Sequence, residues 1–352
     1  MKQKLTTIFA VLMSLVLFAP SVFAAADLPE DHRFYEEMTY LLDKGVITGY
    51  SNGTVQPDKP VTRAEAAIMI GRLKGFDGEQ KATPFSDVPK GHIASGYIAE
   101  AAAAGLLSGY PNGTYNPDAP IVRGDMAIIL DRMFRLEFRL PEDFRDVTPG
   151  MKAHGAIERI LAAHITIGYA DHTFRPAAKV TRGSFAAFLA RGLEPKFKND
   201  AKIPHSYLRD MTKTYTYNSP QGLKTDRYID VPDKNGLRYG FMWTEEVAGK
   251  TTPYLMFENY SELGSGLPYS EGFVVLDYPA VKGQVFYNPA GDHLDMYIIS
   301  GINETVGTPY KTFTNAVVVG DGRTTYYMVE GYGNVKTIDR EGNVLHELVD
   351  VK

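Results

Sequence analysis

The amino-acid sequence contains one motif three times, at a nearly constant spacing. Gly-Tyr-Ser-Asn-Gly-Thr at 49–54 returns as Gly-Tyr-Pro-Asn-Gly-Thr at 109–114 and, less closely, as Gly-Tyr-Ala-Asp-His-Thr at 168–173. The steps between the copies are 60 and 59 residues. An Asp lies 22 residues before each copy and an Arg 14 residues after it, namely Asp27, Asp87 and Asp146, and Arg63, Arg123 and Arg182. Such a period indicates three copies of one supersecondary unit that share a core.

Each copy has the pattern of two helices joined by a loop. Apolar residues recur at helical spacing early in the first copy, at Phe34, Met38, Leu41 and Leu42. Further on, Thr62 and Glu65 precede an apolar run in the arrangement of a capping box, which predicts Thr62 as the N-cap and Arg63 as the first residue of the second helix. Val122 takes the N-cap position in the second copy, where it offers no hydroxyl. The Asn-Gly and Pro residues between the helices favour a tight loop.

Length, charge and cysteine content exclude several classes of protein. The 352 residues exceed the ~100–200 residues of one ordinary domain, so we expect at least two domains. The formal net charge is −5, and no Lys/Arg run occurs beyond the N-terminus, which argues against nucleic acid or an anionic membrane surface as a partner. The chain has no Cys, so disulfides, thiolate metal sites and a Cys nucleophile are excluded.

Residues 1–24 are expected to form a signal peptide. Two lysines precede an apolar run at 5–19, and the small residues Val22 and Ala24 suit cleavage before Ala25. The run is shorter than the ~20 apolar residues that a membrane span needs, which favours cleavage over a retained transmembrane anchor. We therefore expect an exported protein that has no membrane attachment after cleavage.

The repeated residues resemble the S-layer homology domain family. In the second copy the resemblance rests on Phe-Ser-Asp-Val at 85–88, Gly-Leu-Leu at 105–107, the Gly-Tyr loop at 109–117 and Val-Arg-Gly-Asp at 122–125. It implies three modules, at 25–84, 85–143 and 144–195. They would form an all-α spindle with pseudo-threefold symmetry, whose grooves between modules bind pyruvylated secondary cell-wall polysaccharide. Such a spindle would tether an exported protein to the Gram-positive wall without a covalent bond.

The candidate polysaccharide-binding residues recur in the same phase. At the start of a helix, free N–H groups and the positive end of the helix dipole favour an anion. An Arg at the first helical position adds a guanidinium that can donate two hydrogen bonds to one carboxylate, such as that of a pyruvyl group. The residues at this position are Arg63, Arg123 and Arg182. Asp27, Asp87 and Asp146 could accept sugar hydroxyls or cap helices, and Gly49, Gly109 and Gly168 could admit a sugar ring or only form turns. A second set of arginines lies nine residues after the first and could reach a neighbouring groove, or could only stabilise the C-terminus of its helix through the helix dipole. These are Arg72, Arg132 and Arg191.

The copies depart from the family pattern in ways that affect the grooves. The aromatic residue usual six positions after the Asp is replaced by Arg33, Ile93 and Lys152. The third copy has His172 where the turn favours Gly. We expect the grooves that use Arg63 and Arg123 to be the most competent and the third to be degraded.

Beyond Phe197 the sequence predicts an all-β domain. Of the 22 Tyr, 15 lie beyond residue 200, in short runs broken by turn pairs such as Asp321-Gly322. We expect a linker at 196–205 and an antiparallel β-sheet domain at 206–352, built as a curled half-barrel or a sandwich. The predicted strands are 213–218, 226–231, 237–243, 253–258, 272–278, 283–287, 294–299, 314–319, 324–330, 333–338 and 344–349.

The predicted β-domain shows no catalytic constellation. Asp292, His293 and Asp295 could line a cation site, but such a loop is more often a turn. Sequence spacing does not limit a carboxylate pair for glycoside hydrolysis, so that alternative stays open. We expect no metal and no cofactor, and favour a non-enzymatic binding domain over a wall-anchored hydrolase with its active site in 206–352. A lattice-forming S-layer subunit is disfavoured because the second domain is small.

Overall fold

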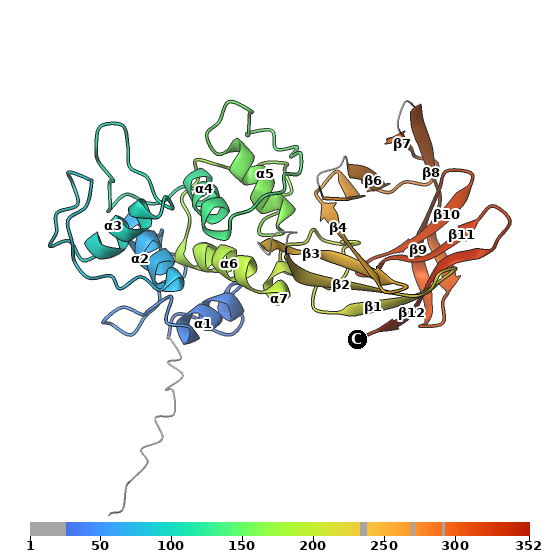
Figure 1. The fold of residues 1–352 in the computed structure, drawn as a ribbon, viewed down its shortest axis with the longest axis horizontal. Coiled ribbons are helices and arrows are strands. Elements are labelled where there is room, and N and C mark those ends of the chain that lie inside the picture. The colour runs from blue at the N-terminus through green and yellow to red at the C-terminus, as the bar shows by residue number, and fades with distance from the viewer. Residues whose placement is uncertain (1–25, 233–237, 269–271, 291–292) are drawn as a thin grey trace, which may run out of the picture.

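The computed structural model describes residues 26–232, 238–268, 272–290 and 293–352. It has a helical half followed by a strand-rich half (Figure 1). The predicted signal peptide at 1–24 and Asp292 lie outside the described residues. In the part of the chain that the structure describes, no helix combines the length and apolar character needed to cross a membrane.

Three helix pairs make up the helical half, and they close into a ring. The pairs are α1 (Tyr35–Asp43) with α2 (Arg63–Lys74), α3 (Ser95–Ala103) with α4 (Arg123–Phe134), and α5 (His154–Ala162) with α6 (Arg182–Leu193). The second helix of each copy packs against the first helix of the next: α2 on α3, α4 on α5 and α6 on α1. Each pair therefore buries its apolar face against its neighbours, and all three copies contribute to one core.

A triangle of backbone hydrogen bonds joins the three copies. The N–H of Val61 donates to the carbonyl of Val180 (2.9 Å), Val180 donates to Ile121 (3.0 Å), and Ile121 donates back to Val61 (2.9 Å). All three residues are buried. Each immediately precedes the N-cap of a second helix, so the triangle lies on the pseudo-threefold axis and fixes where these helices begin.

The predicted helix caps are confirmed. The Thr62 side chain accepts from the Glu65 N–H (3.1 Å), and the Glu65 carboxylate accepts from the Thr62 N–H (2.9 Å), which completes the capping box at the start of α2. Val122 has an extended backbone and makes no side-chain cap at the start of α4.

The strands form one continuous antiparallel sheet rather than the two stacked sheets of a sandwich. In the described residues its order is β6-β5-β4-β3-β2-β1-β12-β11-β10-β9-β8-β7. The strands are β1 (Thr214–Ser219), β2 (Gly222–Pro232), β3 (Arg238–Val247), β4 (Lys250–Glu258), β5 (Glu262–Gly266), β6 (Gly272–Asp277), β7 (Val285–Ala290), β8 (His293–Gly307), β9 (Thr312–Gly320), β10 (Thr324–Val329), β11 (Gly333–Asp339) and β12 (Val344–Val351). Every predicted strand overlaps one of these, and only β5 was missed.

The two edge strands approach each other, so the sheet curls almost shut. The Asn288 side chain of β7 accepts from the N–H of Val274 in β6 and donates to its carbonyl, both at 2.6 Å. The Asn288 amide thus makes to the β6 backbone the two hydrogen bonds that a neighbouring strand would otherwise make.

The two halves contact each other directly. The segment 196–205, which we expected to be a linker, starts within the short helix α7 (Pro195–Lys198), and Phe197 packs against the Tyr40 ring with 5.0 Å between centroids. Further on, the Ser261 hydroxyl of the β-domain donates to the Asp143 carboxylate of the helical half (2.6 Å).

Candidate functional site

Each motif arginine of the helical half reaches into the loop of the next copy. The Nε atoms of Arg63, Arg123 and Arg182 donate to the carbonyls of Tyr115 (2.7 Å), Phe174 (2.8 Å) and Val55 (2.8 Å), respectively. These arginine residues are only 7%, 7% and 4% exposed. Arginine at this position therefore holds neighbouring modules together, a structural role that the sequence reasoning did not assign to it.

The backbone N–H groups at the starts of α2, α4 and α6 are occupied as well. Arg63 and Ala64 donate their N–H groups to the carbonyls of Ala119 and Pro117 in the next copy, both at 2.9 Å. The same two bonds recur at the starts of α4 and α6. Our expectation that free N–H groups of the helix start would bind a ligand carboxylate is therefore wrong, because the neighbouring loop already uses them.

The three motif Asp residues clamp the Gly-Tyr loops. Asp87 accepts from the N–H groups of Tyr115 (2.8 Å) and Asn116 (2.7 Å), and Asp27 and Asp146 make the equivalent pairs of bonds. Desolvation alone would raise the pKa of Asp87, but the two N–H donors outweigh it and lower the pKa. None of the three Asp residues is a helix N-cap, and both oxygens of each carboxylate face the protein's own loop.

Two of the three motif glycines are required by close packing inside the loops. A Cβ on Gly109 would lie 2.4 Å from the Phe85 ring, and one on Gly168 would lie 2.2 Å from the Phe144 ring. At Gly49 the added atom would lie 3.1 Å from the Thr54 carbonyl, which is tight but a smaller conflict. Ring packing therefore accounts for Gly109 and Gly168 without a sugar, and Gly168 also has a φ of +73°, which favours glycine.

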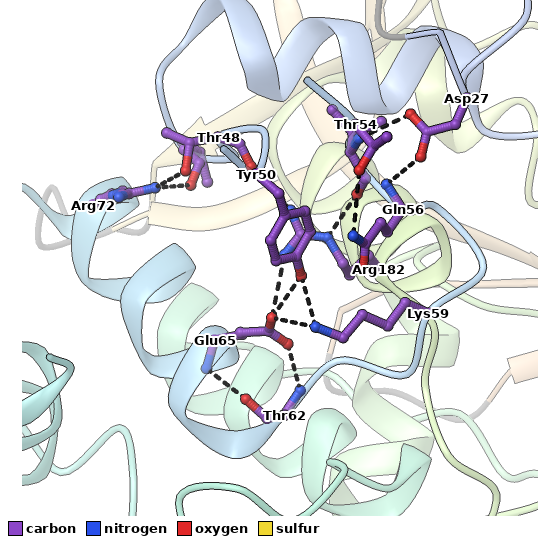
Figure 2. Close-up of polar contacts among 12 residues, drawn as sticks. Asp27, Thr48, Tyr50, Thr54, Gln56, Lys59, Thr62, Glu65, Arg72 and Arg182 are labelled. Carbon is purple, nitrogen blue, oxygen red and sulfur yellow. Dashed lines mark hydrogen bonds and ion pairs between the residues drawn. The ribbon is translucent and has the colours of Figure 1, made fainter. Parts of the chain in front are cut away.

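The second set of arginines lies beside the first set, across module boundaries. Figure 2 shows Arg72 and Arg182 on either side of Thr48: Arg72 Nη1 donates to the Thr48 hydroxyl (3.2 Å), and Arg182 Nη2 donates to the Thr48 carbonyl (3.1 Å). In the other copies, Arg132 and Arg191 each make a bond of 3.5 Å to a carbonyl that follows the first helix. Two arginines from different modules thus meet at one segment.

A pocket of about 110 Å³ lies where the first two modules meet, and Lys152 of the third module also lines it. Arg63, Arg132, Lys152 and Asp125 supply its charged lining, and Gly109 and Tyr110 supply part of its wall. Arg63 Nη1 is paired with the Asp125 carboxylate at 3.0 Å, but among the described residues neither Arg132 nor Lys152 lies within salt-bridge distance of a carboxylate. The pocket therefore has three cations against one anion, and Tyr110, 43% exposed, offers it an aromatic face. We call it the Arg63 groove.

The equivalent position beside Arg182 is filled by the protein itself. Tyr50 donates to the Glu65 carboxylate (2.6 Å), Lys59 donates to the same oxygen (3.2 Å), and Arg182 lies 3.9 Å from it (Figure 2). Burial would raise the pKa of Glu65, but its hydrogen-bond donors prevail and lower it. This Arg182 groove thus has an anion of its own beside the arginine.

Beside Arg123 the acid is missing. The residue that corresponds to Glu65 and Asp125 is Ser184, and among the described residues no carboxylate lies within salt-bridge distance of Arg123. Burial lowers the pKa of Arg123, and the nearby Arg175 and Arg191 act in the same direction. The Arg123 groove therefore has the least neutralised guanidinium of the three.

The acidic residues that the structure describes in the β-domain lie apart from one another or are paired with other side chains. Across the described ranges, no group of three His, Asp or Glu side chains could hold a metal ion. Asp295, one of the loop residues singled out from the sequence, accepts from Arg323 at 2.8 Å. The buried Glu258 accepts from Tyr278 (2.6 Å) and from the Tyr207 N–H (2.9 Å), while burial raises its pKa.

Comparison with known proteins identifies the helical half. The S-layer homology domain model matches residues 26–67, 84–127 and 143–186. The chain is 32% identical over 167 residues to "Cell surface glycoprotein 1" of Acetivibrio thermocellus, covering 43% of this chain and 7% of that protein. It is 30% identical over 191 residues to "Cellulosome-anchoring protein" of the same organism, a match that covers 49% of this chain and 42% of that protein. It is 28% identical over 169 residues to "S-layer protein" of Bacillus thuringiensis subsp. finitimus, a match that covers 47% of this chain and 21% of that protein.

The three segments that the family model matches lie within the helical half, and the chain covers less than half the length of each of these relatives. A solved structure of a Bacteroides fragilis protein with a YmcC-like fold matches 41% of this chain and 97% of its own at 12% identity, but the TM-score of 0.18 supports no inference. The N-terminal half is thus built from three S-layer homology domains, and the protein is a secreted, cell-wall-associated surface protein.

Proposed function

We propose that the S-layer homology domains anchor this protein by binding pyruvylated secondary cell-wall polysaccharide in the grooves between modules. The observation that carries the proposal is the convergence of Arg63, Arg132 and Lys152 on one pocket with a single carboxylate, Asp125. A net positive pocket beside an exposed Tyr suits a sugar that bears a carboxylate, since the cations pair with the acid and the ring stacks on the sugar. The relative called "Cellulosome-anchoring protein" supports an anchoring role.

The cations that meet the ligand in this proposal are Arg132 and Lys152. Arg63 is committed to Tyr115, Ser108 and Asp125, whereas Lys152 is exposed and Arg132 makes one long bond. One charge-assisted contact is worth ~1.5–3 kcal/mol, so a single groove binds weakly. Simultaneous binding of one polymer by the Arg63 and Arg123 grooves would add avidity of ~10²–10⁴.

The β-domain serves, in this proposal, as a non-enzymatic binding domain displayed at the wall. Support comes from the partners of its acids. Asp226 is held by Arg209 at 2.6 Å, and the partly exposed Glu245 is held by Lys224 at 2.9 Å. An ion-paired carboxylate with a depressed pKa, as Asp226 has, is a poor proton donor for glycoside hydrolysis. The buried Glu258 has a raised pKa, but its carboxylate is held by the Ser206 hydroxyl, the Tyr278 hydroxyl and the Tyr207 N–H.

A wall-binding assay tests the anchor. The full chain is mixed with purified cell walls, with and without chemical removal of pyruvate, and the bound fraction is measured. Lys152→Glu reverses a charge inside the Arg63 groove, and Lys90→Glu makes the same change at an exposed lysine that does not line it.

We expect Lys152→Glu to weaken binding about tenfold, the loss of one such contact, while Lys90→Glu binds like the wild type. Removing pyruvate should weaken the wild type and abolish the difference between the two variants. Undiminished binding to depyruvylated walls would refute the proposed ligand.

A further inference from the structure

A second polar pocket, of about 400 Å³, lies on one face of the β-sheet. Its lining comes from Arg209, just before β1, and from the consecutive strands β5, β4, β3, β2, β1, β12 and β11. The register explains the convergence, because Asp226 of β2 lies directly opposite Glu245 of β3, which lies opposite Thr252 of β4. Residues opposite one another point to the same face of a sheet. We call this the sheet pocket.

The floor of the sheet pocket is a buried ion pair surrounded by tyrosines. Arg209 Nη1 donates to Asp226 Oδ2 at 2.6 Å, and the two residues are 4% and 3% exposed. Arg209 also donates to the hydroxyls of Tyr217 and Tyr254, and its guanidinium lies 4.0 Å from the centroid of the Trp243 ring. Burying such a pair carries a large desolvation cost for each ion, which good geometry and further hydrogen bonds must offset. A buried charge network of this kind favours a functional site over a simple core.

Two buried acceptors in the sheet pocket have no partner within the described protein. They are Oδ1 of Asp226 and Oδ1 of Asn334, and both residues line the pocket. Buried acceptors of this kind are rare, because each one costs free energy unless a donor reaches it. Arg209 Nε, a buried donor that belongs to another lining residue, has no partner within the described residues either. The pocket therefore calls for a ligand that both donates and accepts hydrogen bonds, as a hydroxyl group does.

The charges of the sheet pocket cancel. Arg209 and Lys224 face Asp226 and Glu245, with Lys224 Nζ 2.9 Å from Glu245 and 3.8 Å from Asp226. His346 adds no charge, since burial lowers its pKa to about 3 and Lys224 acts in the same direction. An anion would meet no free cation here, and a cation would find both acids already paired.

We propose that the sheet pocket binds an uncharged saccharide. Sugar hydroxyls donate to Asp226 Oδ1 and Asn334 Oδ1 and accept from side-chain hydroxyls such as that of Thr252. The stacked rings of Tyr217 and His346, with centroids 4.0 Å apart, and the side chains of Met256 and Leu267 give the pocket an apolar wall for sugar C–H groups. The inference rests on the proposed role of the β-domain as a non-enzymatic binding domain, but it does not depend on the grooves of the helical half.

Two rim substitutions test the pocket without touching its buried network. Leu267 is 53% exposed and lines the pocket, so Leu267→Trp places a bulky ring at its mouth. Val281→Trp is the matched control, because Val281 has the same 53% exposure but does not line the pocket. Glu245→Gln replaces one partly exposed acceptor oxygen by an NH2 donor and removes the negative charge while keeping the side-chain shape.

Chitotetraose, cellotetraose and maltotetraose are titrated into the full chain by calorimetry. We expect at least one of them to bind saturably, Leu267→Trp to lose at least ~10-fold in affinity, and Val281→Trp to bind like the wild type. Glu245→Gln should weaken binding without lowering the melting temperature. Lys152→Glu should bind the same sugar normally, which separates a failure of this site from a failure of wall anchoring.

Absence of binding by all three sugars would overturn the inference. Equal binding by Leu267→Trp and Val281→Trp would also overturn it, because the sugar would then bind elsewhere. Cleavage of a probe to shorter sugars would replace the non-enzymatic role with hydrolysis.

Discussion

Replacing Arg63 by Ala tests whether the motif arginine holds the modules together. Its guanidinium donates to the Tyr115 carbonyl, the Ser108 carbonyl and the Asp125 carboxylate at 2.7, 3.0 and 3.0 Å, and the residue is 7% exposed. All three partners belong to the second module. Alanine at this position would leave two carbonyls near the module boundary without their donor.

The expected cost follows from those contacts. The Arg63–Tyr115 hydrogen bond is buried, and leaving the Tyr115 carbonyl without a donor costs ~1–3 kcal/mol. Ser108 is exposed and the Asp125 side chain is 40% exposed, so water resolvates both partners and each loss adds less than ~1 kcal/mol. We therefore expect Arg63→Ala to lower the free energy of unfolding of the helical half by about 2–4 kcal/mol. For a domain of this size that shifts the melting temperature by roughly 4–16 °C.

Urea unfolding followed by far-ultraviolet circular dichroism at the helical band measures this loss. Arg132→Ala is the control, because Arg132 is only half-buried and makes one bond, of 3.5 Å. We expect it to cost less than ~1 kcal/mol. If Arg63→Ala were no more destabilising than Arg132→Ala, the proposed structural role of the motif arginine would be wrong.

Two further substitutions probe helix capping and a buried amine. Val122→Thr should raise the free energy of unfolding by ~1 kcal/mol, because the hydroxyls of Thr62 and Thr181 at the equivalent positions accept from the N–H of the third residue of the helix. Thermal denaturation measures the change, with Val122→Ala as the control. A Thr variant no more stable than the wild type would contradict this reasoning. Burial lowers the pKa of Lys198 from 10.5 to about 7. Between these values the unfolded chain holds a proton that the folded chain lacks, so stability rises with pH through this window. Lys198→Met should flatten that rise in a urea series from neutral to alkaline pH, and an unchanged slope would refute the assignment.

Much of the architecture followed from local patterns. The in-phase Gly-Tyr loops and apolar stripes predict three helix pairs, and the Thr62–Glu65 spacing predicts the start of α2, because helix capping depends on residues three apart in the chain. Alternation and turn pairs located every strand except β5 (Glu262–Gly266). That strand was missed because its Gly, Ser and Glu are poor strand formers, and its pairing with β4 and β6 decides its conformation.

What a residue does within the repeats was decided by contacts between modules. The sequence alone showed that Arg63, Arg123 and Arg182 recur in phase, but it did not show that their donors and the N–H groups of their helices are used by the next copy. Asp226, Glu245 and His346 stand at distant positions of the chain, and only the register of seven neighbouring strands brings them to one pocket. Local periodicity fixes secondary structure because it acts over a few residues, whereas burial and charge pairing depend on which distant segments meet.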